Sequence, residues 1–213
     1  MKSRLSDLCA FADERIAVAD LDLDTYISTE NMLPNKEGIT RSAGLPTVSQ
    51  TQAYQANDVL ISNIRPYFRK IWFADREGGC SNDVLVLRAN KYVHPHFLYY
   101  LLSDDSFFDY TTATAKGTKM PRGDKSSIMR YEVPDLSLDI QVGIADTLSA
   151  LDDKIILNKK INHHLSGSMS KTDSSPDIRW GKRVSRNIAS LRLSTRLFIT
   201  CSYNEAIRPP IAA

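Results

Sequence analysis

The sequence predicts a mixed α/β domain, of the α+β kind, followed by one long coiled-coil-forming helix. Two observations predict the domain: strand-length apolar runs at 59–61 and 83–87, and a later segment whose apolar residues recur at helical spacing. A third predicts the long helix, because apolar residues recur every three and four positions near its start and middle. We therefore expect a domain over residues 1–137, a helix over 138–165 and an irregular, low-complexity tail over 166–213.

Composition limits the possible classes of protein. The 213 residues contain 27 Lys and Arg against 25 Asp and Glu, a formal charge of +2, so local charge must indicate any nucleic-acid partner. Cys9, Cys80 and Cys201 are odd in number and lack CxxC spacing, which argues against a disulfide framework or zinc site and favours a reducing cytoplasm. The sequence has no apolar run of the ~20 residues that a membrane span needs.

Each element of the first part follows from local patterns. Residues 1–12 predict a short amphipathic helix, and residues 26–29 are β-prone. Two strand-like pieces flank the break at Pro66. Gly78-Gly79 predicts a tight turn, and the run 83–87 predicts a strand buried on both faces.

The second part continues with helices and a polar loop. A helix is predicted to open at His94-Pro95 and to continue to Phe108. Residues 111–125 then form a glycine-punctuated loop, before a short helix from Ser126 and a strand ending at Pro134. The two heptad rows of the long helix contain Leu148, Ile155 and Asn162, and Ile144, Leu151, Asn158 and Leu165.

Enzyme signatures are missing from the sequence. It has no Walker loop, GxGxxG turn, GxSxG elbow or HExxH pair. The segment Asn63–Tyr67 only partly matches the Asn-Pro-Pro-Tyr motif of amino-methyltransferases, since Ile64 and Arg65 replace the prolines. Asp135 with Asp152-Asp153-Lys154 matches a metal-dependent nuclease pattern, but a solvated helix face is the favoured interpretation. We expect no catalysis, no cofactor and no metal.

Two basic clusters are candidates for DNA contact. In the polar loop, side chains and backbone amides can bind phosphates, and Arg122 can bridge the two acceptors of a guanine. That cluster contains Lys116, Thr118, Lys119, Arg122 and Lys125. The second cluster, in which cations alternate with Tyr67, Phe68 and Trp72, contains Arg65, Arg69 and Lys70. A solvated loop and an amphipathic edge strand are the alternative interpretations.

Three segments together carry a family resemblance. They read NDVLISNIRPYFRKIWFA, GGCSNDVLVLR and KGTKMPRGDKSSIMRYEVPDLSLDIQVGIADTLSALDDKIILNKKINHHL. The chain resembles one half of the specificity subunit of a type I restriction-modification enzyme, over most of residues 1–165. Its most specific part joins Val133-Pro134 to Gln141, Leu148, Leu151, Asp152, Ile155, Asn158 and Asn162.

The resemblance implies a function and partners. It implies an α/β target-recognition domain that reads one half of a split double-stranded DNA sequence, and a helical spacer that sets the distance to the other half. It also implies that methylation and cleavage belong to other subunits: the methyltransferase (modification) subunit docks here and brings the restriction subunit. A full specificity subunit has two recognition domains and two spacer helices, whereas this chain contains one of each.

The spacer helix is predicted to form a homodimer. Its apolar seam is too narrow for the buried side of a globular helix, and Asn158 and Asn162 on the seam predict a fixed register. The family's arrangement implies antiparallel pairing. Two alternatives stay open: a scaffold in which the helix does the essential work while the domain has lost DNA binding, and the metal-dependent nuclease.

Overall fold

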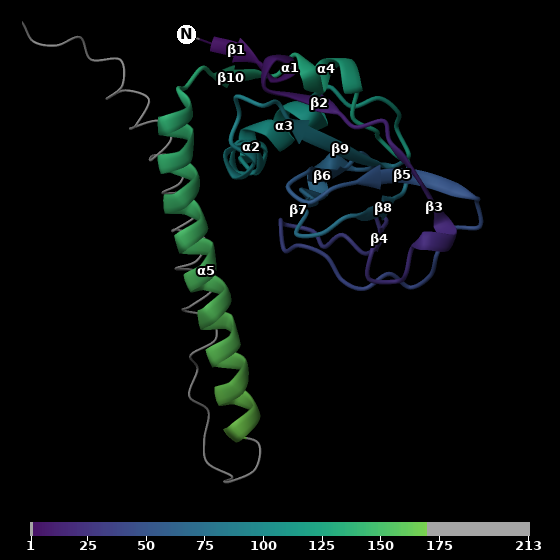
Figure 1. Ribbon diagram of the computed structural model, residues 1–213, viewed down its shortest axis with the longest axis vertical. Helices are drawn as coiled ribbons and strands as arrows, with labels where there is room; N and C mark the ends of the chain where they lie inside the picture. Colours follow the sequence, from purple (N-terminus) through teal and green to yellow (C-terminus); the bar gives the residue numbers. More distant parts are fainter. Residues whose placement is uncertain (1, 170–213) are drawn as a thin grey trace, which may run out of the picture. The chain divides into compact units, whose positions relative to one another are not determined.

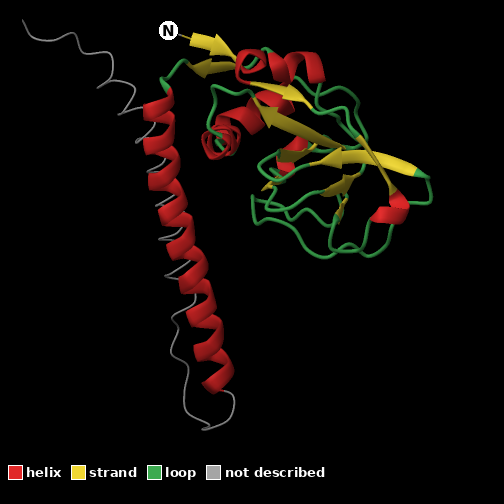
Figure 2. Cartoon of the chain, viewed as in Figure 1, coloured by secondary structure: helices red, strands yellow, loops and turns green. Residues whose placement is uncertain are grey.

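The computed structural model describes residues 2–169, and the chain divides into two units, Met1–Ala145 and Asp146–Ala213. The first unit is mixed α/β, as predicted (Figures 1 and 2). Its strands are β1 (Lys2–Arg4), β2 (Cys9–Phe11), β3 (Arg15–Ala17), β4 (Tyr26–Ile27), β5 (Gln50–Tyr54), β6 (Val59–Ser62), β7 (Ile71–Phe73), β8 (Gly78–Cys80), β9 (Val84–Ala89) and β10 (Glu132–Pro134). Its helices are α1 (Leu5–Leu8), η1 (Val18–Asp20), η2 (Pro66–Phe68), α2 (Pro95–Leu102), α3 (Asp105–Ala113), α4 (Lys125–Met129) and the start of α5 (Leu138–Met169).

The strands of residues 2–169 form three sheets. One has the order β2-β9-β6-β7 and is antiparallel throughout, with Leu60 opposite Val86 in its centre. Another has the order β3-β5-β8-β4, in which only the β4–β8 pair is parallel. The third is the short pair β1-β10. The predicted strands at 59–61 and 83–87 are therefore confirmed as the central pair β6 and β9.

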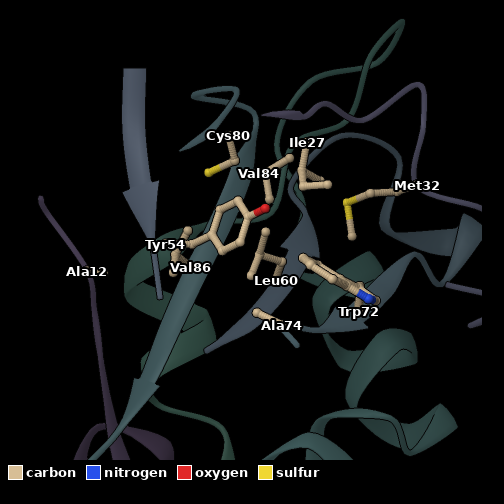
Figure 3. Packing of buried hydrophobic residues seen from close by; sticks show 10 residues of the cluster. All are labelled: Ala12, Ile27, Met32, Tyr54, Leu60, Trp72, Ala74, Cys80, Val84 and Val86. Atoms are coloured by element: carbon tan, nitrogen blue, oxygen red, sulfur yellow. The ribbon is translucent and has the colours of Figure 1, made fainter. Parts of the chain in front are cut away.

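The core of the first unit forms where these strands bury their apolar side chains. All four residues of β6 and the first four of β9 are buried, which is the burial expected of a central strand covered on both faces. Tyr54 and Trp72 meet edge to face, with ring centroids 5.7 Å apart. Figure 3 shows these two rings within a cluster that also contains Ala12, Ile27, Met32, Leu60, Ala74, Cys80, Val84 and Val86.

The turn predicted at Gly78-Gly79 is wrong, because these glycines lie in strand β8. A Cβ atom on Gly78 would stand 2.2 Å from the Thr25 carbonyl oxygen and 2.6 Å from the Tyr54 hydroxyl. One on Gly79 would stand 2.5 Å from Leu21 Cδ1. The glycines therefore permit close packing inside a sheet instead of a reversal of the chain.

The amphipathic helix predicted for residues 1–12 is also wrong. Its residues form strand β1, the single turn α1 and strand β2. β1 pairs with β10 and β2 pairs with β9, so their backbone groups are bonded to segments far along the chain. Leu5 and Leu8 are buried in α1, which explains the apolar spacing. Tertiary strand pairing overrides a weak local helical signal here.

The single helix predicted from His94-Pro95 is divided into α2 and α3. Asp104 separates them and caps α3, because its Oδ1 accepts a hydrogen bond from the Ser106 backbone N–H at 2.8 Å. Helix α2 packs on the sheet strands β6, β7 and β9, and α3 contacts η2. The short helix predicted near residue 126 and the strand before Pro134 are confirmed as α4 and β10.

The start of α5 is fixed to the first unit by Gln141. Its Nε2 donates to the Leu136 carbonyl at 2.9 Å, and its Oε1 accepts from the His94 backbone N–H at 3.0 Å. Ile144 is buried further along. This contact explains why a buried glutamine stands beside the strand–helix junction, because its amide satisfies two backbone groups.

In the second unit, α5 continues to Met169, four residues past the predicted end at Leu165. Leu148 is buried, but Leu151, Leu157 and Ile161 are 43%, 57% and 46% exposed. The rest of the predicted tail, residues 170–213, lies outside the described residues, as does Cys201. Within residues 2–169, no helix combines the length and apolar character needed to span a lipid bilayer.

Candidate nucleic-acid interface

The predicted basic loop is a short closed structure between α3 and α4. Lys116 and Arg122 bond to each other through both backbone pairs, each N–H donating to the other's carbonyl at 2.9 Å. Gly117 permits the reversal, since its φ of +97° is a conformation that favours glycine. Thr118 and Lys119 lie at the exposed tip. The backbone therefore presents these polar side chains from a defined base.

The loop is fixed to the segment after β6. The Arg65 backbone N–H donates to the Pro121 carbonyl at 2.8 Å, and the Gly123 N–H donates to the Asn63 carbonyl at 3.0 Å. Ile64 and Arg122 form an isolated β-bridge between these contacts. The two basic clusters, far apart in the sequence, therefore meet at Arg65.

The cations of the loop differ in their partners. Lys116 Nζ lies 3.4 Å from Asp124, and Arg122 Nη2 lies 3.0 Å from Asp83, yet both basic side chains are largely exposed. Lys125 Nζ lies over the Phe11 ring, 5.4 Å from its centroid. Within residues 2–169, Lys119 has no ion pair or side-chain hydrogen bond.

Asp124 is the acid that orders the end of the loop. The Ser127 and Ser126 hydroxyls donate to its Oδ2 at 2.8 and 2.9 Å. These hydrogen bonds, with a smaller contribution from Lys116, lower the pKa of the Asp124 carboxyl to about 2. The carboxylate is therefore ionised at neutral pH and competes with any phosphate for Lys116.

Two cations of the second cluster are held by the fold. Arg69 Nη1 lies 3.1 Å from Asp105, and its Nη2 lies 3.3 Å from Asp109 on α3. Lys70 Nζ donates to the Thr29 carbonyl at 2.6 Å, and burial lowers the pKa of its ammonium group. Arg65 is exposed and has no ion pair within the described part of the chain. Among residues 2–169, Arg65 thus differs from Arg69, which contacts two acids, and from Lys70, which donates to a carbonyl.

The aromatic residues of that cluster divide between core and surface. Trp72 is buried, whereas Tyr67 and Phe68 are exposed. The turn that presents them has left-handed backbone at Arg65 and Arg69, with φ of 50° and 53°. The buried and exposed members of the three aromatics could not be distinguished from the sequence, because the alternation of a strand does not continue through such a turn.

The predicted spacer positions also differ in exposure. Ile144 and Leu148 are buried, so the exposed part of the seam begins at Leu151. Ile155 is partly exposed, and Asn158 and Asn162 are exposed. The side chain of Leu165 lies outside the described residues.

The acids and histidines do not form a metal centre in the described residues. Among residues 2–169, no three His, Cys, Asp or Glu side chains gather as ligands for a metal ion. The His94 and His96 rings lie 5.9 Å apart, and His96 packs on Phe73 at 4.1 Å. Buried Cys9 and Cys80 are free thiols, and burial raises the pKa of each to about 12.

Comparisons with known proteins agree on one family. Residues 1–166 match the type I restriction modification DNA specificity domain. The specificity subunit of the Escherichia coli type I restriction enzyme EcoDI is 25% identical over 160 residues, covering 70% of this chain and 35% of that protein. The HindI specificity subunit of Haemophilus influenzae is 30% identical over 151 residues, covering 66% and 32%. The chain thus spans about a third of the length of these curated relatives.

The fold agrees with a solved specificity subunit. The HsdS subunit of Thermoanaerobacter tengcongensis superposes with a TM-score of 0.59 at 19% identity, over 83% of this chain and 51% of that one. The matched relatives are specificity subunits, which are the non-catalytic class of type I systems. The chain therefore belongs to the type I restriction modification DNA specificity domain family.

Proposed function

We propose that this chain binds double-stranded DNA and reads one half of a bipartite target through the loop Lys116–Lys125 and Arg65. The observation that carries the proposal is the closed loop itself, which the backbone bonds of Arg65 and Gly123 fix in place. A rigid base reduces the conformational entropy that ordering a loop on DNA would cost. The family match supports a role in DNA specificity.

The loop residues have different roles in this proposal. Lys119, at the exposed tip, contacts phosphate, and Thr118 adds a hydroxyl donor beside it. Arg122 reads a guanine through its planar fork, which exchanges Asp83 for the base. Phosphate contacts position the domain without reading sequence, whereas the base contact specifies it.

A salt series tests whether the chain binds DNA. The native chain should shift a mixed pool of duplexes, with affinity falling steeply between about 50 and 200 mM salt as phosphate contacts release counterions. Lys91→Ala is the matched control, because Lys91 comes after Ala89 at one end of β9, whereas Asp83, the partner of Arg122, precedes Val84 at the other end. Absence of any salt-dependent shift would leave the scaffold function as the better account. Magnesium-dependent cutting by the chain would favour the nuclease.

The exposed seam of α5 supports a homodimer as part of the same proposal. Leu151 is 43% exposed, and Ile155 and two asparagines follow it at heptad spacing. These residues form a row that a second helix would cover. Two copies, antiparallel as in the family's paired spacers, would hold two recognition domains apart and read inverted half-sites. The domain would then end near residue 137 and the spacer helix near residue 165.

Charges placed in the seam test the dimer. Leu151→Asp with Ile155→Asp should convert a sedimenting dimer into a folded monomer, because two buried carboxylates would be unpaired in the interface. Asp153→Ala, which changes a charge off the seam, should leave the dimer intact. A native chain that sediments as a monomer at tens of micromolar would contradict the dimer.

The proposal also assigns a protein partner. A type I modification subunit, the methyltransferase, would dock on the chain and bring the restriction subunit to DNA. When the chain is co-expressed with a modification subunit, affinity capture through this chain should recover the two proteins in a fixed ratio. Capture that survives in the Leu151→Asp/Ile155→Asp variant would separate docking from dimerisation, and a failure to capture would remove this part of the proposal.

A further inference from the structure

Two surface aromatics, Tyr67 and Phe68, lie beside the proposed DNA-binding loop, and Lys70 Nζ lies 5.9 Å from the centroid of the Phe68 ring. Tyr67 is 48% exposed and Phe68 is 39% exposed, and their ring centroids lie 4.7 Å apart with the planes tilted by 53°. Trp72, from the same segment, is buried against Tyr54. A touching pair of exposed rings is an apolar patch that water does not favour, so it marks a contact surface.

The backbone holds this pair rigidly. Arg65 and Arg69, on either side of η2, both have left-handed backbone, which residues other than glycine seldom adopt. Asn35 donates its backbone N–H to the Phe68 carbonyl at 2.9 Å, and Lys36 donates to the Arg69 carbonyl at the same distance. Asn35 and Lys36 are themselves left-handed. Such conformations gather where a fold must present side chains to a ligand.

The charges around the pair indicate its occupant. On one side, the Arg65 backbone is bonded to Pro121, so the rings adjoin the basic loop and a guanidinium that has no ion pair within residues 2–169. On the other side, the two α3 carboxylates that contact Arg69 are balanced by Arg69 together with Lys36, so these four charges cancel. The uncompensated charge next to the rings is therefore positive, which fits a polyanion carrying flat apolar groups.

We propose that the Tyr67–Phe68 pair packs against bases of the DNA that the loop holds. The inference rests on the proposed DNA binding and deepens it. Aromatic rings stack on bases or wedge against a base step without neutralising phosphate. Affinity would then have two separable parts: a salt-dependent part from the cations and a salt-independent part from the rings.

The test substitutes both rings in the full chain. The probe is a duplex enriched by the native chain from a pool of random-sequence duplexes, carrying 2-aminopurine at successive positions. Tyr67→Ala/Phe68→Ala should raise Kd by roughly tenfold or more at every salt concentration while the salt slope stays that of the native chain. The native chain should change the fluorescence of 2-aminopurine at one position of the duplex, and the double variant should not.

Matched variants separate ring contact from other effects. Tyr67→Phe keeps the ring and should keep the affinity. Tyr92→Ala removes another exposed ring and should leave Kd unchanged. Tyr92 is 71% exposed, and Lys91 Nζ lies 4.7 Å from the centroid of its ring. If the double variant melts below the native chain, Tyr67→Ser alone is the test, because the Tyr67 side chain is 48% exposed and has no hydrogen bond among residues 2–169.

Each other outcome would overturn the inference. An unchanged Kd would show that the rings do not touch DNA, and a flatter salt slope would show that the substitution had displaced the loop cations instead. Retained DNA binding with lost capture of a modification subunit would identify the pair as a protein interface. If the native chain enriches no duplex, the proposed function fails together with the inference, whereas binding with unchanged Kd refutes the inference alone.

Discussion

The turn Arg65–Lys70 and the loop Lys116–Lys125 are both basic, but the fold uses their cations differently. Arg69 and Lys70 are bound to acids of α3 and to a backbone carbonyl. Lys119 projects from the loop without a protein partner in residues 2–169, and Arg122 holds its acid while more than half exposed. A cation that completes the fold and a cation available to a ligand are thus distinguished by their partners and exposure.

Arg122 should give the largest effect on DNA binding. Its replacement by Ala should cost about 1 to 3 kcal/mol on the preferred duplex and much less on other sequences, because a bidentate base contact is lost. Competition binding between the preferred duplex and a duplex of another sequence measures this difference. Arg122→Lys keeps the charge without the fork and should lose the same discrimination. Equal losses on all sequences would make Arg122 another phosphate contact.

Gly123 tests whether the attachment of the loop matters. A Cβ at this position would stand 2.9 Å from Asn63 Oδ1, a buried acceptor without a hydrogen bond in residues 2–169, and 3.1 Å from Ile128 Cδ1. Gly123→Ala should lower the free energy of unfolding by about 1 kcal/mol and weaken DNA binding several-fold, since the loop must shift.

A second glycine provides the control for that substitution. A Cβ on Gly143 in α5 would meet nothing within 4 Å. Gly143→Ala should therefore raise the free energy of unfolding by about 0.5 to 1 kcal/mol, through helix propensity, and leave DNA binding unchanged. Urea unfolding measures both variants. A Gly123→Ala chain with native stability and affinity would show that the contact with Asn63 does not fix the loop.

Lys119 should give a smaller and less specific effect. Lys119→Ala should weaken binding to all sequences alike and reduce the slope of log affinity against log salt by about 0.9, the release of one counterion. The unfolding curve should stay native, because no ion pair of the described residues includes Lys119. Anisotropy titrations over a salt series give the slope. An unchanged slope would remove the loop tip from the interface.

Much of the fold could be predicted because its signal is local. β6 and β9 are apolar runs buried on both faces, and α5 has heptad spacing, so a short window of sequence indicates each. The secondary structure of the first 12 residues could not be predicted in this way, because β1 and β2 pair with strands β10 and β9 far along the sequence. Gly78 and Gly79 gave a turn signal although they serve close strand packing.

The candidate site shows the same division. The basic loop is recognisable from composition, since its lysines, arginine and glycines occur together. The roles of Arg69 and Lys70 are not, because Asp105, Asp109 and the Thr29 carbonyl reach them only through the fold. Nor could sequence show that Tyr67 and Phe68 face outward while Trp72 faces inward, since left-handed backbone at Arg65 and Arg69 interrupts the alternation.

Arg69 should give the smallest effect, which makes it the sharpest test of the comparison. Its two ion pairs with Asp105 and Asp109 are partly exposed, and such pairs contribute at most about 1 kcal/mol. Arg69→Ala should therefore lower the free energy of unfolding by less than about 1 kcal/mol, and should do so less at high salt, where screening weakens the pairs.

The same substitution should leave DNA binding unchanged. Arg69 is already paired with Asp105 and Asp109 and is expected to contact no phosphate. Its removal should therefore leave the number of counterions released on DNA binding, and hence the salt slope, as in the native chain. Comparison with Lys119→Ala by anisotropy, and of Arg69→Ala/Asp109→Ala with its single variants by urea unfolding, separates the two roles. A flatter salt slope in Arg69→Ala would show that this cation leaves α3 to bind DNA, and the turn and the loop would then form one basic surface.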